Sequence, residues 1–164
     1  MASTQKNLNT YSEKNIGNLS LKRFGIVVSE WNTDVTGLLF EGAIQTLAKY
    51  GVSKVNIVKA EVPGSFELSL GSQMMALKDE IDAVICLGCV IQGETRHFEF
   101  ICQAVAHGIT NVGLKYNKPV IFGILTTDNQ KQALERAGGR YGNKGEEAAI
   151  TAIKMLGFNP IALD

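Results

Sequence analysis

The chain has 164 residues, 45% of them hydrophobic, which is enough for one domain with a substantial core. Its 16 basic and 16 acidic residues give a formal net charge of zero, which argues against nucleic-acid and membrane partners and leaves little repulsion between copies of the chain. No apolar run is long enough to cross a bilayer and no apolar signal segment stands at the N-terminus, so we expect a cytoplasmic protein.

Residues 1–20 are polar and show no hydrophobic periodicity. This composition predicts a mobile tail or an arm that docks on a neighbouring copy. Residues 21–164 contain no internal repeat and no low-complexity linker, so we expect them to form a single domain.

Short apolar runs bounded by turn residues predict strands over residues 24–28, 55–62, 83–91 and 119–125. Helical spacing of apolar residues predicts helices over residues 34–50, 65–77, 96–107, 128–137 and 144–156. The expected helix caps are Thr33 or Asp34, Thr95, Thr126–Asp128 and Asn143, and Gly108 is expected to end the third helix. The alternation predicts an α/β fold, a three-layer αβα sandwich with a four-stranded parallel, flavodoxin-like sheet that an N-terminal strand could join.

Cys86 and Cys89 form a C-x-x-C motif, a spacing found in metal and redox sites. Residues three apart on a strand point to opposite faces of the sheet, so these two thiols are not expected to share a metal. A redox pair normally opens a helix instead of lying inside a strand. Together with Cys102 they are the chain's cysteines, and we interpret them as reduced thiols of a cytosolic protein.

Several loops are expected to meet at one edge of the sheet, because the carboxyl ends of parallel strands lie together and ligands bind there. Trp31 follows the first strand, where it is either packing or an aromatic wall, and its position favours the wall. Glu67 follows the second strand at a helix start, where a carboxylate also complements the helix dipole.

The stretch over residues 82–98 is the centre of this arrangement, since it runs from a buried strand into a helix start that carries His97. Free N–H groups in a first helical turn attract anions, and an imidazole beside them can transfer protons. Arg136 and Lys144 flank a glycine-rich break and are either phosphate ligands or solvated cations. His107 is interpreted as a cation near a helix end. The set suits proton transfer on an aromatic substrate while a phosphate is held at the same site.

The chain resembles the lumazine synthase family over nearly all of residues 24–157. The matching stretches, in family order, are WNTDVTGLLFEGA (31–43), VPGSFEL (62–68), DAVICLGCVIQGETRHFEF (82–100), PVIFGILTTDNQKQALERAG (119–138) and GNKGEEAA (142–149). The resemblance implies a reaction of riboflavin biosynthesis, in which 5-amino-6-(D-ribitylamino)uracil condenses with 3,4-dihydroxy-2-butanone 4-phosphate. An imine forms, phosphate leaves, and ring closure gives 6,7-dimethyl-8-ribityllumazine. No metal or redox cofactor is implied.

The resemblance also implies roles for single residues. His97 would transfer protons, and the pyrimidine would be held by Trp31, Ser65, Phe66, Glu67, Cys89, Val90, Ile91 and Phe122. The butanone phosphate would be held by Gly93, Glu94, Thr95, Arg136 and Lys144. A neighbouring subunit would contribute Phe122, Arg136 and Lys144, because family members are pentamers with sites between subunits. Some members assemble twelve pentamers into an icosahedral shell, and riboflavin synthase is a further implied partner.

The chain departs from the family pattern at three positions. Trp31 replaces the commoner Phe, Gln92 stands where a basic residue is frequent, and Cys89 replaces a small or hydroxyl residue. The larger ring of Trp31 preserves stacking and could also favour tight flavin binding. The alternative function is therefore a non-catalytic flavin-binding or cage-forming relative.

Overall fold

The computed structural model describes residues 18–158, so all but the last three residues of the expected arm over residues 1–20 lie outside the described residues. The strands of the main sheet are β1 (Phe24–Ser29), β2 (Ile57–Val62), β3 (Ala83–Ile91) and β4 (Val120–Thr127). Around them lie α1 (Thr33–Lys49), α2 (Leu68–Ala76), α3 (His97–Tyr116), α4 (Gln130–Glu135) and α5 (Lys144–Leu156). Smaller elements are the 3-10 turn η2 (Lys54–Asn56) and the short strands β5 (Ala137–Gly139) and β6 (Gly142–Asn143).

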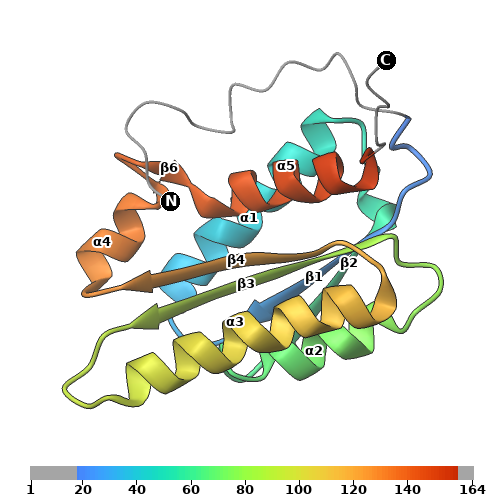
Figure 1. Ribbon diagram of the computed structural model, residues 1–164. Coiled ribbons are helices and arrows are strands. Elements are labelled where there is room, and N and C mark those ends of the chain that lie inside the picture. Colours follow the sequence, from blue (N-terminus) through green and yellow to red (C-terminus); the bar gives the residue numbers. More distant parts are fainter. Residues whose placement is uncertain (1–17, 159–164) are drawn as a thin grey trace, which may run out of the picture.

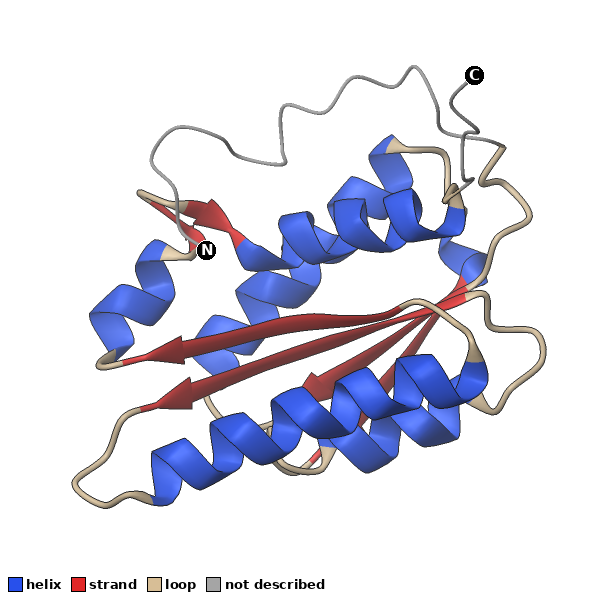
Figure 2. Cartoon of the chain, in the orientation of Figure 1, coloured by secondary structure: helices blue, strands red, loops and turns tan. Residues whose placement is uncertain are grey.

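The main sheet is parallel and has the strand order β2-β1-β3-β4, which confirms the expected α/β fold. Helices α1 and α5 cover one face and α2 and α3 cover the other, so the molecule has three layers (Figure 1). All four strand arrows point the same way, towards the loops that precede α1, α2, α3 and α4 (Figure 2). None of the helices in residues 18–158 is long and apolar enough to span a membrane.

One hydrophobic core lies on each side of the sheet, because alternate residues of a strand face opposite ways. Ile85, Leu87 and Cys89 of β3 belong to the core beneath α1 and α5, whereas Val84 and Cys86 belong to the core beneath α2 and α3. The two thiols of the C-x-x-C motif are thus on opposite faces, as predicted. Both are free and buried, and Cys102 is free and half-buried.

Several predicted boundaries are wrong by a few residues. The second strand begins at Ile57, since η2 occupies residues 54–56, and the second helix begins at Leu68 instead of near residue 65. The fourth strand continues to Thr127 because its last residues pair with Cys89–Ile91. Asn129 therefore caps α4, and its side chain accepts a hydrogen bond from the Gln132 amide at 3.0 Å.

The C-terminal part of the chain shows one confirmed cap and one missed element. Asn143 caps α5, as predicted, by accepting a hydrogen bond from the Gly145 amide at 2.8 Å. The fourth helix does not reach residue 137, because it ends at Glu135 and the β5–β6 hairpin follows.

The third helix does not end at Gly108 but continues to Tyr116, where Asn117 adopts the left-handed conformation of a helix end. The interpretation of His107 as a C-terminal cation is therefore wrong. Gly108 faces Ser69 of α2, and a Cβ atom at residue 108 would lie only 2.7 Å from the Ser69 Cβ atom. Glycine is required here because two helices approach closely, and not because the helix stops.

We expect Gly108→Ala to lower the melting temperature, although alanine favours helices by about 1 kcal/mol over glycine. Overpacking a tight contact typically costs about 1–3 kcal/mol, which outweighs that gain. Gly37→Ala is the matched control in α1, since no atom lies within 4 Å of the added Cβ and the substitution should raise the melting temperature. Equal shifts of the same sign in both variants would contradict the close approach of α2 and α3.

Candidate active site

Hydrogen bonds between backbone groups join the loops at the carboxyl edge of the sheet. The amides of Glu30 and Trp31 donate to the carbonyls of Val62 and Pro63, at 2.9 and 3.3 Å, which links the loops that follow β1 and β2. The Gln92 amide donates to the Thr127 carbonyl at 2.8 Å and links the ends of β3 and β4. These bonds join the four strand ends into two pairs, β1 with β2 and β3 with β4.

Asn32 closes the remaining gap, between β1 and β3. Its side-chain amide donates to the Cys89 carbonyl at 2.9 Å, and its backbone is left-handed, with φ of 61°. Asparagine tolerates this conformation better than most residues. Asn32 is also the residue that precedes α1, so the predicted caps Thr33 and Asp34 are wrong. The Asn32 side chain does not cap the helix, because it is bonded to the Cys89 carbonyl at the sheet edge.

Trp31 and Glu67 both lie beside Gly64 on this surface. A Cβ atom placed on Gly64 would be 3.5 Å from Trp31 Cδ1 and 3.1 Å from Glu67 Oε2. The Trp31 side chain is 72% exposed, and Phe66 in the same region is 53% exposed. The exposed ring of Trp31 lies near a carboxylate, and this makes a surface on which a planar polar ring can stack.

Ser65 brings an unsatisfied polar group to the same region. The residue is buried, and its Oγ atom has no hydrogen-bond partner among residues 18–158. It lies over Gly88 of β3, where a Cβ atom would be 2.7 Å from Ser65 Oγ. A buried hydroxyl without a partner is costly, and it is explained when a ligand supplies the missing hydrogen bond.

Cys89, Val90 and Ile91 form the end of β3, next to this hydroxyl. Burial raises the pKa of the Cys89 thiol to about 11 and that of the Cys86 thiol to about 12. Both thiols are therefore protonated near neutral pH, and a thiol is a far weaker nucleophile than a thiolate. The contribution of Cys89 to the edge is its backbone, whose carbonyl Asn32 holds in place.

The loop over residues 93–95 leads into α3, and His97 is the first residue of that helix. Helix α3 begins one residue later than predicted, and the Thr95 hydroxyl accepts a long hydrogen bond, 3.4 Å, from the His97 amide. The loop and the histidine are exposed. The start of a twenty-residue helix offers free amide groups and a positive dipole end, so the loop can receive an anion beside an accessible imidazole.

Arg136 and Lys144 lie beyond the end of β4. Arg136 ends α4, where its Nη1 atom donates to the Gln132 carbonyl at 3.2 Å, and Lys144 begins α5, where its Nζ atom pairs with Glu147 at 2.8 Å. In the described part of the chain, neither cation has a hydrogen bond or ion pair with the loop over residues 93–97. Arg136 and Lys144 belong to α4 and α5, on the α1 side of the sheet, whereas His97 begins α3 on the other side (Figure 1).

Phe122 also stands apart from the loops. It pairs with Cys86 in the middle of the sheet and packs on the α2 and α3 side. Since β4 ends at Thr127, five residues at about 3.3 Å each separate Phe122 from the carboxyl edge. One chain therefore joins the loops after β1, β2 and β3, but it does not bring Phe122 to them.

Sequence reasoning missed two residues with a part in this geometry. The sequence places Asn32 with Trp31 in the loop after the first strand but assigns it no contact of its own, although an Asn between a strand and a helix is a common left-handed residue and is a usable signal. Tyr141 was treated as part of a glycine-rich break, and its ring contacts Arg136. Residues 18–158 hold no group of three or more His, Cys, Asp or Glu side chains arranged to bind a metal ion.

Comparisons with known proteins give one consistent result. The family model described as 6,7-dimethyl-8-ribityllumazine synthase matches residues 21–159. A protein of that name from Cytophaga hutchinsonii is 65% identical over 95% of this chain and 98% of its own length. Similar proteins of the same name come from Parabacteroides distasonis, 52% identical over 97% of this chain and 99% of its own, and from Phocaeicola vulgatus, 51% identical over 96% and 94%.

Proposed function

The chain belongs to the 6,7-dimethyl-8-ribityllumazine synthase family, and from this premise we propose how its side chains take part in the reaction. It is a transferase of riboflavin biosynthesis, which condenses 5-amino-6-(D-ribitylamino)uracil with 3,4-dihydroxy-2-butanone 4-phosphate and releases phosphate. The assignment of each substrate to a part of the carboxyl edge rests on the chemistry of the groups found there.

The pyrimidine substrate is proposed to bind between Trp31 and the end of β3. Its planar ring matches the exposed aromatic wall of Trp31 and Phe66, and its polar edge and ribityl hydroxyls match Glu67 and the backbone of residues 89–91. The observation that carries this placement is the buried Ser65 hydroxyl, since it lacks a partner in the described part of the chain. A hydroxyl of the ribityl chain is a suitable partner.

The butanone phosphate is proposed to bind at the loop over residues 93–95, where the start of α3 attracts the phosphate. Arg136 of a neighbouring subunit would add positive charge beside the phosphate. Lys144 of that subunit would add less, because Glu147 partly neutralises it. The same subunit would supply Phe122. One chain does not bring these residues to its own loops, and this observation supports a site between subunits.

His97 is proposed to move protons during the condensation. The amine of the pyrimidine adds to the ketone, and expulsion of water to form the imine requires a proton on the departing hydroxyl. Loss of phosphate then requires removal of a proton from the carbon next to the imine. An exposed imidazole beside the anion loop can serve both steps, as acid and then as base.

We expect Ser65→Ala to raise the KM for the pyrimidine about 2- to 10-fold, the effect of losing one ordinary hydrogen bond. The melting temperature should not fall, because the removed hydroxyl has no partner in the free protein. Ser72→Ala is the matched control: the buried Ser72 hydroxyl donates to the Ser69 carbonyl at 2.9 Å, so this variant should lose stability and keep its KM. An unchanged pyrimidine KM in Ser65→Ala would exclude the proposed contact.

His97→Ala is expected to lower kcat by about 10²–10⁴, the usual contribution of a general acid or base. Turnover should persist, since holding two substrates together supplies much of the rate. The measurement is lumazine absorbance together with phosphate release, and His107→Ala, on an exposed turn of the same helix, is the control that should retain its rate. A wild-type oligomer that forms no product would favour the alternative, a non-catalytic flavin-binding or cage-forming relative.

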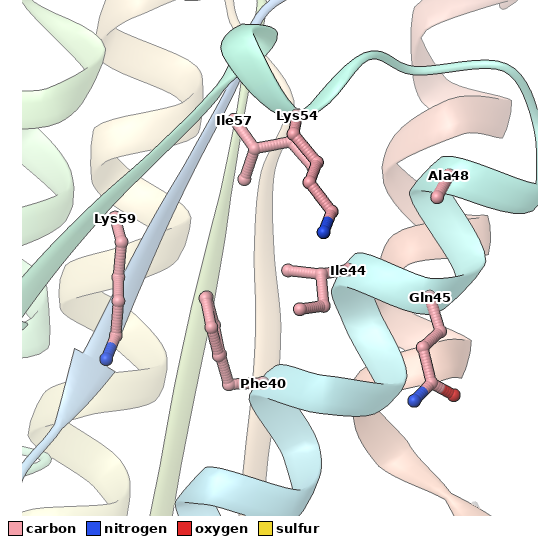
Figure 3. Close-up of a pocket in the computed structure, with 7 residues that line it drawn as sticks. All are labelled: Phe40, Ile44, Gln45, Ala48, Lys54, Ile57 and Lys59. Carbon is pink, nitrogen blue, oxygen red and sulfur yellow. The ribbon is translucent and has the colours of Figure 1, made fainter.

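We further propose that the chain forms a homo-oligomer, a pentamer or an icosahedral shell, in the cytoplasm and with riboflavin synthase as a partner. The free thiols support a reducing compartment. Within the described residues the outer side of β2 has no strand partner. Beside it is an apolar groove of about 480 Å³, lined by Phe40, Ile44, Gln45, Ala48, Lys54, Ile57 and Lys59 (Figure 3).

The proposed occupant of this groove is the N-terminal segment of a second copy. An unpaired strand edge beside an apolar groove can accept an added strand. The described chain starts close to this edge, because Asn56 Nδ2 donates to the Ser20 carbonyl at 2.8 Å. Seventeen residues precede the described part, enough for an added strand.

A chain that starts at residue 18 should therefore sediment as smaller species than the full chain. Ile44→Lys in the full chain should have the same effect, since it places a charge in the groove that receives the segment. Thr110→Lys, at an exposed position of α3, adds the same charge away from the groove and serves as its control. Unchanged sedimentation of both the truncated chain and Ile44→Lys would contradict the docking of the segment.

A further inference from the structure

The β5–β6 hairpin places an aromatic ring against Arg136. The Tyr141 amide donates to the Glu135 carbonyl and the Lys144 amide to the Arg136 carbonyl, each at 2.8 Å, so the hairpin is fixed to the end of α4 on both sides. Gly138 and Gly142 permit the tight turn through their positive φ angles of 116° and 81°. The Arg136 guanidinium carbon lies 4.8 Å from the centre of the Tyr141 ring.

This contact orients Arg136 without using up its hydrogen-bond donors. A guanidinium that packs against an aromatic ring does so with its face, whereas its five N–H groups lie at the edge. Within residues 18–158, the one side-chain hydrogen bond of Arg136 runs from Nη1 to the Gln132 carbonyl at 3.2 Å. The contacts with the ring and with this carbonyl leave most of the N–H donors for an anion, and a planar set of such donors matches a phosphate.

We propose that Tyr141 is a positioning residue for phosphate binding: its ring holds the guanidinium of Arg136 so that the free N–H edge meets the phosphate of the butanone substrate. The inference rests on the proposed role of Arg136 in binding that phosphate. A flexible arginine must be ordered when an anion binds, and that ordering weakens binding. A guanidinium already held by the ring and by Gln132 avoids part of this loss.

Arg140 provides an internal comparison. Its guanidinium carbon lies 5.3 Å from the same ring, but the residue is exposed and sits on the turn of the hairpin. It has no side-chain hydrogen bond to the described part of the chain that would fix its plane. The ring is therefore shared by two cations, of which only Arg136 is also held by a backbone carbonyl.

The test measures KM for both substrates and kcat on the assembled oligomer. Tyr141→Leu, which removes the ring and keeps an apolar side chain, should raise the KM for the butanone phosphate about two- to five-fold, the effect of an exposed cation–π contact. The pyrimidine KM and kcat should stay within two-fold of the wild type, which a general folding defect would not allow. Tyr141→Phe keeps the ring and should restore the wild-type KM, and Arg140→Gln should leave it nearly unchanged.

Arg136→Ala separates this inference from the role of Arg136. It should raise the butanone phosphate KM far more than the pyrimidine KM, and adding Tyr141→Leu to it should have no further effect. If Arg136→Ala raises that KM and Tyr141→Leu does not, or if the two effects add, the positioning role is wrong and the phosphate role of Arg136 stands. If Arg136→Ala leaves the butanone phosphate KM unchanged, both assignments are wrong. Calorimetric titration of each variant with inorganic phosphate should show the same order of binding.

Discussion

The hydrogen bond from the Asn32 side chain to the Cys89 carbonyl joins the two central strands of the sheet at the point where they separate. Backbone pairing between β1 and β3 stops at Val28 and Leu87, and β3 then continues beside β4 alone. This is the switch point of the strand order, where open α/β sheets have a crevice. The amide of Asn32 spans that crevice and fixes the loop carrying Trp31 relative to the backbone of residues 89–91. The proposed contacts of the pyrimidine with Trp31 and with residues 89–91 depend on this spacing.

The residues of the site fall into two groups by position in the fold. Trp31, Ser65, the end of β3 and His97 come from loops that hydrogen bonds join along one edge. Phe122 lies in the middle of β4, and Arg136 is fixed to the β5–β6 hairpin. If both groups act in the reaction, as proposed above, two copies of the chain must come together. In that proposal the oligomer is part of the catalytic apparatus, and the surfaces between copies are under the same functional constraint as the site.

Much of the fold could be predicted from the sequence, because local patterns determine it. The apolar run over residues 83–91 is observed without change as β3, and Asn143 caps α5 as its spacing indicates. The errors arise where a distant contact decides. Gly108 looked like a helix end but meets Ser69 of another helix, and Asn32 looked incidental but reaches Cys89. In the candidate site, the position of His97 at the start of a helix, just after the loop over residues 93–95, could be predicted from the sequence. The contact of Tyr141 with Arg136 could not, because it depends on the path of a hairpin that no local pattern predicts.

In the proposed placement of the pyrimidine, the buried hydroxyl of Ser65 bears on how the enzyme tells similar pyrimidines apart. An analogue that lacks the matching ribityl hydroxyl would fill the site and leave the Ser65 oxygen buried without a partner. A site built to hydrogen-bond a substrate hydroxyl rejects such an analogue, because a buried polar group left unpaired is costly. On this proposal, the selectivity for the ribityl chain follows from where the fold buries one serine.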